Sequence, residues 1–238
     1  TTLQTNSTAG FSMGTYTGNG GYATIGHGLG AIPDLVMIKG RGTNGGAAQY
    51  WVVGAPNHSA FGNTASKHMF LDTTNAVMNN TTIWYNTAFT TSTIPIGPHA
   101  AINNSSGTYV FYAFKNIQGY SKIGEYKGTG ARDYAPFVYT GFQPAFLMVK
   151  NTAAATGWAI FDNRRNIANG DMHYLAADRN DAESGTGFSH VDPVDFLSNG
   201  FKVMNSDAWM NTSGTSYLYM AFAQHPFVTS TGVPCTAR

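Results

Sequence analysis

The chain has 238 residues, of which 11% are charged, and its formal net charge at pH 7 is +1. So little positive charge excludes the broad basic surface with which proteins bind nucleic-acid phosphates. The apolar runs are too short to span a bilayer, so no membrane insertion is expected, and a single cysteine excludes an internal disulfide. The 28 glycines and 13% aromatic residues favour short strands joined by tight turns.

After a lead-in at residues 1–9, the first half offers a series of short strands. The segment GFSMGTYTGNG (residues 10–20) ends in a glycine-rich stretch that fits a hairpin with positive φ angles. Pro33 precedes an apolar run at residues 35–38 that is typical of a buried strand. Further strands are expected at residues 50–54, 68–71 and 109–114, with a long polar stretch between the last two.

The second half repeats these blocks in the same order. GYSKIGEYKGTG (residues 119–130) matches the first segment, GFQPAFLMVK (141–150) matches GAIPDLVMIK (30–39), and SGTSYLYMAF (213–222) matches SSGTYVFYAF (105–114). Trp158 likewise matches Trp51, and the offsets run from 107 to 111 residues. The matches predict a duplication, with repeats at residues 10–118 and 119–227 and a tail at 228–238.

The expected fold class is all-β: two tandem duplicated antiparallel β-sandwich units, jelly-roll-like and lectin-like, either separate or packed as one pseudo-symmetric domain. A helical turn is expected around residues 176–182. The polar stretches that differ between the halves are expected to be loops, and loops on a shared scaffold are where binding specificity usually resides.

Catalytic motifs are missing from the sequence. It contains no G-x-S-x-G elbow, and its seven histidines are scattered without an H-x-H or H-E-x-x-H pair. Seven of the twelve acidic residues lie between Asp162 and Asp195. This number is large enough to supply the two catalytic carboxylates of a glycosidase, but no other feature of the sequence supports such a pair. We therefore predict that the chain is not an enzyme, with a polysaccharide depolymerase as a minor alternative.

The same acidic stretch contains a candidate calcium site. Its oxygen ligands would come from Asp178, Asp181, Glu183 and Asp192, although the stretch lacks the EF-hand spacing and its turn glycine. The alternative is a set of solvated loop charges, with no cofactor bound.

Candidate ligand-binding residues are aromatic side chains beside amides in the polar stretches: Trp84, Tyr85, Asn86, Trp209 and Asn211. Sugar faces stack on aromatic rings, and sugar hydroxyls pair with amide groups. The alternative is that both tryptophans pack in the sandwich core, as is expected of the matched Trp51 and Trp158.

Taken together, GTYTGNG, GHGLGAIPDLVMIK, PFVYTGFQPAFLMVKN, DFLSNGFK and SGTSYLYMAFAQHPF resemble a duplicated domain of unknown function. That domain occurs near the C-termini of tail-fibre and other structural proteins of tailed phages, especially marine ones. The resemblance implies a location on the virion surface and an assembly of several copies, most simply a trimer, in contact with other virion proteins. It transfers no catalytic or binding residues.

From these features we predict a tail-fibre C-terminal module that recognises a host-surface glycan or protein. The alternative is a purely architectural component, either a capsid decoration or a segment of the fibre shaft.

Overall fold

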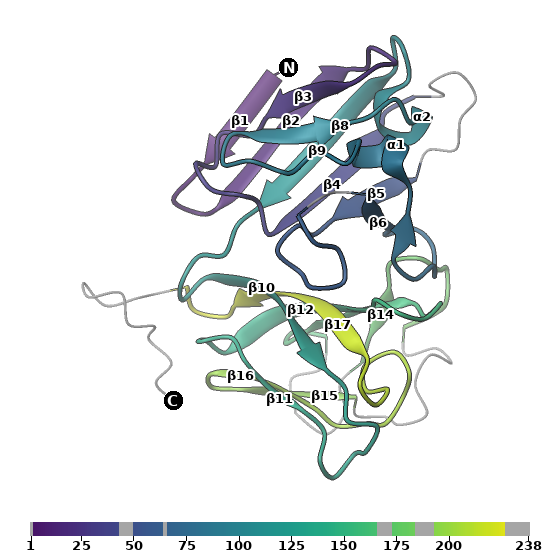
Figure 1. Cartoon of the computed structure of the whole chain (residues 1–238). Coiled ribbons are helices and arrows are strands. Elements are labelled where there is room, and N and C mark those ends of the chain that lie inside the picture. Colours follow the sequence, from purple (N-terminus) through teal and green to yellow (C-terminus); the bar gives the residue numbers. More distant parts are fainter. Residues whose placement is uncertain (1, 43–49, 64–65, 166–172, 184–192, 227–238) are drawn as a thin grey trace. The chain divides into compact units, whose positions relative to one another are not determined.

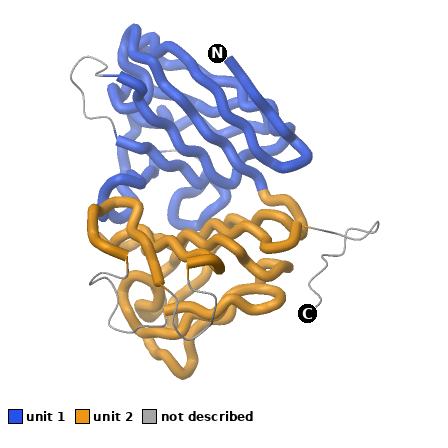
Figure 2. Tube along the Cα trace, turned by 180° about the vertical axis from the view of Figure 1, so that it is seen from behind, with its two compact units in different colours: residues 1–115 blue, residues 116–238 orange. Residues whose placement is uncertain are grey.

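The computed structural model is all-β, built from antiparallel sheets in a sandwich arrangement (Figure 1). It describes residues 2–42, 50–63, 66–165, 173–183 and 193–226. The chain divides into two compact units, Thr1–Lys115 and Asn116–Arg238 (Figure 2). Each unit has its own hydrophobic core, and the two are described separately below.

Unit 1 contains a seven-stranded sheet with the order β1-β2-β9-β4-β5-β6-β7. Its strands are β1 (Thr2–Asn6), β2 (Phe11–Thr17), β4 (Leu35–Gly40), β5 (Trp51–Gly54), β6 (Lys67–Phe70), β7 (Met78–Asn79) and β9 (Thr108–Phe114). The remaining elements are the strand pair β3 (Ala23–Gly26) and β8 (Thr93–Ile96) and the short helices α1 (Thr81–Trp84) and α2 (Ala100–Asn103). The segment expected as a lead-in thus forms β1, which pairs with β2.

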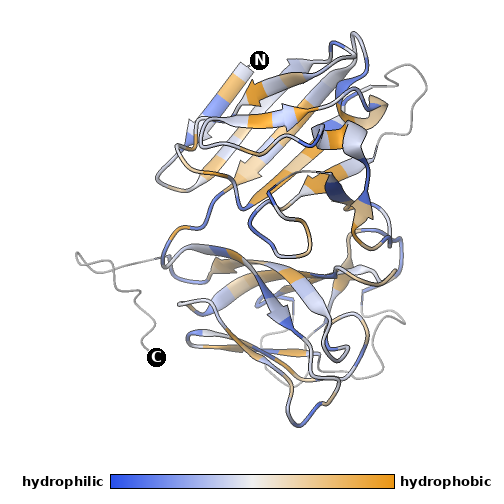
Figure 3. Ribbon diagram, in the orientation of Figure 1, coloured by the Kyte–Doolittle hydropathy of each residue, from blue (hydrophilic) through white to orange (hydrophobic). Residues whose placement is uncertain are grey.

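One face of the large sheet of unit 1 packs against β3, β8 and the two helices. Strand residues alternate in burial: in β2, Ser12, Gly14 and Tyr16 are buried, whereas Met13 and Thr17 are exposed. Figure 3 colours the strands by hydropathy, with hydrophobic residues in orange. The core contains Val36, Ile38, Val52 and Phe111 from the large sheet, Ile25, Ile94 and Ile96 from the strand pair, and Ile83 and Ile102 from the helices. Each such buried side chain contributes about 1.5–3 kcal/mol of transfer free energy.

Unit 2 pairs a five-stranded sheet, with the order β10-β17-β12-β13-β14, with a three-stranded sheet, with the order β11-β16-β15. The larger sheet comprises β10 (Ser121–Lys127), β12 (Pro144–Asn151), β13 (Trp158–Asp162), β14 (Leu175–Ala176) and β17 (Ser216–Ala223). The smaller one comprises β11 (Phe137–Tyr139), β15 (Val194–Leu197) and β16 (Gly200–Val203). The order β10-β17-β12-β13-β14 matches β2-β9-β4-β5-β6 of unit 1 strand for strand.

The glycine-rich stretches after β2 and β10 do not form the expected hairpins. Each carries the chain from the large sheet of its unit to the small one, since β2 and β3 lie in different sheets, as do β10 and β11. Gly20 and Gly130 have φ angles of 72° and 78°, which glycine adopts without steric cost. The prediction of positive φ angles is confirmed for Gly20 and Gly130 but is wrong for Gly14, Gly18, Gly124 and Gly128, and the predicted hairpin connection is wrong.

A tyrosine–asparagine cluster fixes this crossing in unit 1. The Tyr16 and Tyr109 rings stack with centroids 5.1 Å apart, and the Tyr16 hydroxyl donates to the Ile102 carbonyl at 2.6 Å. The fully buried Asn103 accepts from the Asn19 N–H at 2.9 Å and donates its Nδ2 to the Gly21 carbonyl. The buried amide thus satisfies the backbone of the turn, which has no strand partner there.

Unit 2 contains the same cluster in different residues. The Tyr126 and Tyr217 rings stack at 5.0 Å, and the Tyr126 hydroxyl donates to the Met210 carbonyl at 2.9 Å. Asn211 accepts from the Thr129 N–H at 2.7 Å and donates to the Ala131 carbonyl at 3.1 Å. Burial raises the pKa of Tyr16 and of Tyr126 well above the usual value, so both hydroxyls remain protonated donors.

Helical structure lies elsewhere than expected. Within residues 176–183 the chain forms a strand end and turns, and the helices of the described chain are α1 and α2, both in unit 1. The asparagine- and aspartate-rich sequence there offers side-chain partners to the backbone, which competes with helix formation. Among the described residues, no helix is long and apolar enough to cross a membrane.

Candidate functional site

A shallow groove lies on the outer face of the β3–β8 pair in unit 1. Its walls are the rings of Tyr22, from the segment before β3, and Tyr85, which directly follows α1; the two rings stack on one another. Their exposed fractions are 54% and 44%, which are high for such large apolar side chains. The groove therefore displays an aromatic pair that the core does not use.

The backbone holds Tyr85 and Asn86 in an uncommon conformation. Their φ angles are 58° and 49°, in the left-handed region that glycine usually occupies at the end of a helix. Asparagine tolerates this region, but tyrosine in it costs about 1–2 kcal/mol. Local strain of this kind concentrates at binding and catalytic sites. Glycine would adopt this backbone conformation without strain, so the presence of tyrosine indicates that its exposed ring has a function.

The remaining walls of the groove are small and polar. Thr24 on β3 and Thr87 after α1 place hydroxyl groups at its rim, and Pro95 of β8, paired with Thr24, lies buried beneath them. The groove has a volume of about 270 Å³. A proline is tolerated in β8 because this strand has a neighbour on one side alone.

The chemistry of the groove is neutral. A hydrogen bond to the Tyr85 side chain raises the pKa of the Tyr22 phenol, so the phenol stays protonated near neutral pH. Two stacked rings and two threonine hydroxyls suit a ligand with an apolar face and peripheral hydroxyls. The sequence signal for Tyr22 was weak, because this tyrosine stands alone in a glycine-rich turn.

A family model described as Domain of unknown function (DUF7483) matches residues 1–226. The chain belongs to this family. The DUF7483 match covers both units and every described residue, so the domain comprises the pair of units and includes the groove. No curated protein and no solved structure matches the chain.

Trp84 of this DUF7483 domain is not displayed as expected. It is fully buried, its Nε1 donates to the Lys67 carbonyl at 3.0 Å, and it packs on Phe89 with ring centroids 5.2 Å apart. A Cβ added to Gly54 would lie 2.9 Å from the Trp84 ring, so the glycine makes room for it. The expectation of an exposed Trp84 platform is wrong, because the ring fills the core beside Tyr85.

Trp209 is also a packing residue. It is 8% exposed, lies edge-on to Tyr174, and has the Arg179 guanidinium 4.6 Å from its ring centroid. The ring contacts Gly157 so closely that no Cβ would fit there. Because Trp209 is buried and the Arg179 guanidinium lies over its ring, it does not offer an exposed face to a sugar.

Asn211 does not point to solvent either. It is fully buried, and both ends of its amide are occupied by the backbone bonds of the cluster in unit 2. Its role matches that of Asn103 in unit 1. Of the five candidate ligand-binding residues, Tyr85 lines the groove, Asn86 is exposed next to it in the chain, and Trp84, Trp209 and Asn211 are buried.

The candidate calcium ligands pair with cations and backbone. Asp178 has a fully buried side chain whose Oδ1 accepts from the Trp158 N–H at 2.7 Å, as Asp72 accepts from the Trp51 N–H in unit 1. Asp181 lies 3.7 Å from Arg179. Asp178 is thus a structural residue with a counterpart in unit 1, which the sequence comparison missed.

The last two candidate calcium ligands are Glu183 and Asp192. Glu183 accepts from Arg165 at 3.2 Å and contacts His173, whereas Asp192 lies outside the described residues. Within the described part of the chain, no three acidic, histidine or cysteine side chains gather closely enough to hold a metal ion. The carboxylates that are described are engaged with arginines instead of converging on a common point.

Proposed function

We propose that the chain is a non-enzymatic structural protein of a tailed-phage virion, exposed on the particle surface as the C-terminal, receptor-binding module of a tail fibre. Its ligand is a host-surface glycan, bound in the Tyr22–Tyr85 groove. The resemblance of its strand and turn motifs to tail-fibre domains supports the location, and the exposed tyrosine pair carries the binding function.

The groove suits a sugar ring better than a peptide or an ion. Its stacked rings offer an apolar face to the C–H face of a pyranose, and Thr24 and Thr87 add hydroxyl groups beside that face. Among the described residues, no charged side chain lines the groove, so a neutral glycan is the matching ligand. The strain at Tyr85 is the cost of holding the ring in place.

A glycan array probed with the full chain tests this proposal. Tyr22→Ala is expected to weaken binding of the selected glycan about tenfold, the equivalent of one lost stacking contact. Tyr85→Gly removes the second ring while relieving the left-handed strain, so it is expected to abolish binding and leave the free energy of unfolding within about 1 kcal/mol of wild type.

Tyr134→Ala is the matched control, since Tyr134 is an 82% exposed tyrosine of unit 2 outside the groove. It is expected to bind like the wild type. Binding that survives both groove variants, or that falls equally in the control, would contradict the assignment of the groove.

One observation favours the architectural alternative, in which the partners are copies of the chain and other virion proteins. Strand β1 is an edge strand whose five residues are all exposed and uncharged. Natural edge strands usually carry charges or proline that block strand addition. An assembly of copies, a trimer in the simplest case, would be disrupted by Gln4→Lys, and light scattering of both proteins measures this. A particle map that places the chain away from a fibre tip would favour this alternative.

We also propose that the two units arose by duplication of one β-sandwich. The matching strand orders and the two tyrosine–asparagine clusters support this origin.

A further inference from the structure

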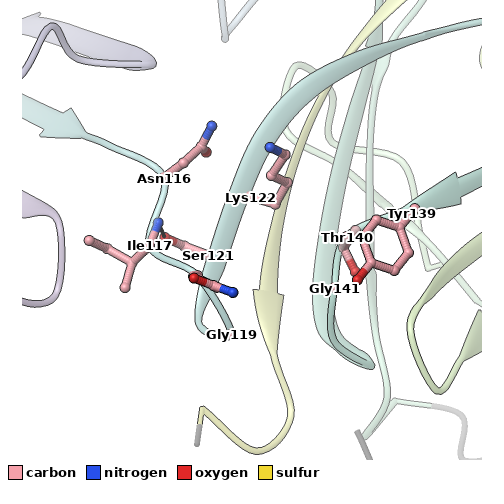
Figure 4. Close-up of a pocket in the computed structure, with 9 residues that line it drawn as sticks. Asn116, Ile117, Gly119, Ser121, Lys122, Tyr139, Thr140 and Gly141 are labelled. Carbon is pink, nitrogen blue, oxygen red and sulfur yellow. Dashed lines mark hydrogen bonds between the residues drawn. The ribbon is translucent and has the colours of Figure 1, made fainter. Parts of the chain in front are cut away.

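Unit 2 contains a pocket of about 320 Å³ at the start of β10 (Figure 4). One side is the turn that begins at Asn116, and the other is the segment from Tyr139 to Gly141 at the end of β11; Lys122 of β10 lies between them in Figure 4. Gln118 also lines it. All the lining residues belong to unit 2, so the pocket is complete within that unit.

In unit 1 the corresponding place is filled by β1. The match that pairs Gly30 with Gly141 places Gly28 at the position of Tyr139, and Gly28 has a φ angle of 68°. A Cβ on Gly28 would meet Thr5 Oγ1 at 2.8 Å and Leu3 at 3.3 Å. Thr5 Oγ1 also lies 3.2 Å from the Ser12 hydroxyl.

Lys122 takes the place of Ser12 in unit 2. Ser12 pairs with Ala113 on β9, and Lys122 pairs with Ala221 on the corresponding β17. In unit 1, β1 fills this place. In unit 2 the place is an open pocket, and the ammonium group of Lys122 lines it.

The edge of β10 beside the pocket does not accept a strand. The Asn116 side chain occupies it by donating Nδ2 to the Ile123 carbonyl at 3.0 Å and accepting from the Ile123 N–H. Ile117 forms an isolated bridge with Ser121 next to it. Because the backbone groups of Ser121 and Ile123 are bonded in this way, the pocket is open to a compact ligand and closed to an added strand.

The lining chemistry selects the ligand. The half-buried Lys122 is the one charged residue that lines the pocket among the described residues, so nothing in the lining neutralises an ammonium group there. The Tyr139 ring is 63% exposed, and Gln118 offers an exposed amide. A carboxylate suits the ammonium, a pyranose ring suits the tyrosine face, and hydroxyls suit the amide.

We propose that this pocket binds an acidic monosaccharide unit, a pyranose ring that carries a carboxylate. The ligand class rests on the glycan-binding function proposed above, but the site and its residues are independent of the Tyr22–Tyr85 groove. The domain would then bind two kinds of sugar unit of a surface polysaccharide: a neutral ring in unit 1 and an acidic ring in unit 2.

The probes are methyl glucuronide and, as a matched neutral sugar, methyl glucoside, titrated into the isotope-labelled full chain and followed by backbone amide shifts. The glucuronide is expected to shift the amides of residues 118–122 and 139–141, and the glucoside is expected to leave them unchanged. Lys122→Met keeps the side-chain stem without the charge and is expected to weaken glucuronide binding about tenfold or more. Tyr139→Ala is expected to weaken it as well.

Lys127→Met, on the exposed end of the same strand, is the control and is expected to bind like the wild type. Unchanged amide spectra outside the pocket verify that each variant is folded. Equal binding of both sugars, no shift at the pocket residues, or indifference to Lys122→Met would overturn the proposal. The groove variants Tyr22→Ala and Tyr85→Gly leave this readout intact, so failure of one site is distinguishable from failure of the other.

Discussion

The two units connect their large and small sheets in the same way, but their exposed surfaces differ. In each, stacked tyrosines and a buried asparagine fix the crossing from the large sheet to the small one. Beside the small sheet of unit 1, Tyr22 and Tyr85 line a neutral groove, whereas unit 2 has a pocket that Lys122 lines. The matched residues hold the scaffold, and our proposal assigns ligand binding to residues that differ between the units.

The largest expected effect tests whether the two clusters are equivalent. Asn103→Ala and Asn211→Ala each leave buried backbone groups of the turn unsatisfied, so each is expected to lower the free energy of unfolding of its own unit by about 3 kcal/mol. Hydrogen exchange followed by peptide mass spectrometry resolves the two units, and Asn79→Ala, at an exposed position of β7, is the control. If one variant lost much of its free energy of unfolding and the other lost none, the two clusters would not be equivalent.

The second-largest expected effect is a difference between the two units in how much stability each loses at low pH. Burial, helped by the nearby charge of His99, lowers the pKa of His68 to about 4. A histidine whose pKa is lower in the folded state than in the unfolded chain stabilises fully above pH 6.5, and this stability is lost as the pH falls toward 4. Between pH 7.5 and 5, unit 1 is expected to lose about 2 kcal/mol.

Burial also lowers the pKa values of His27 and His99, both in unit 1, and so adds to this loss. Exchange protection of each unit measured against pH checks the prediction. His68→Gln is expected to flatten the response of unit 1, and equal acid sensitivity of the two units would speak against the assignment.

The smallest expected effect concerns the turn glycines. Gly20→Ala and Gly130→Ala place a Cβ on left-handed backbone beside Ser105 and Ser213 respectively, and each is expected to cost about 1 kcal/mol. Thermal unfolding of the two variants measures the costs. Values that differ by more than about 1 kcal/mol would show that the two turns are not equivalent.

Much of the scaffold could be predicted from the sequence, because apolar runs and Ser-Gly turn signals are local. The pairing of β2 with β9 and of β10 with β17 joins the segments that matched between the halves. The destination of the glycine-rich stretches could not be predicted, since the same turn residues serve a hairpin or a crossing between sheets.

The site was harder to predict than the scaffold. Whether Trp84 is displayed depends on Gly54, which lies 30 residues earlier in the chain and leaves room for the ring. The role of Asn211 depends on a turn about 80 residues away, at Thr129 and Ala131. Tyr22 and Tyr85 lie 63 residues apart in the chain: Tyr22 directly precedes β3, which pairs with β8, and Tyr85 directly follows α1, which contacts β8. Contacts of this range leave no local pattern in the sequence.

The central claim is that recognition resides on the unmatched surfaces and not on the shared scaffold. Amide shift mapping of the full chain with a glycan selected from the array tests it most directly. We predict shifts at Tyr22, Thr24 and residues 85–87, with the amides around Asn103 and Asn211 unchanged. Shifts confined to the strands that both units share, with none at the groove, would contradict this account.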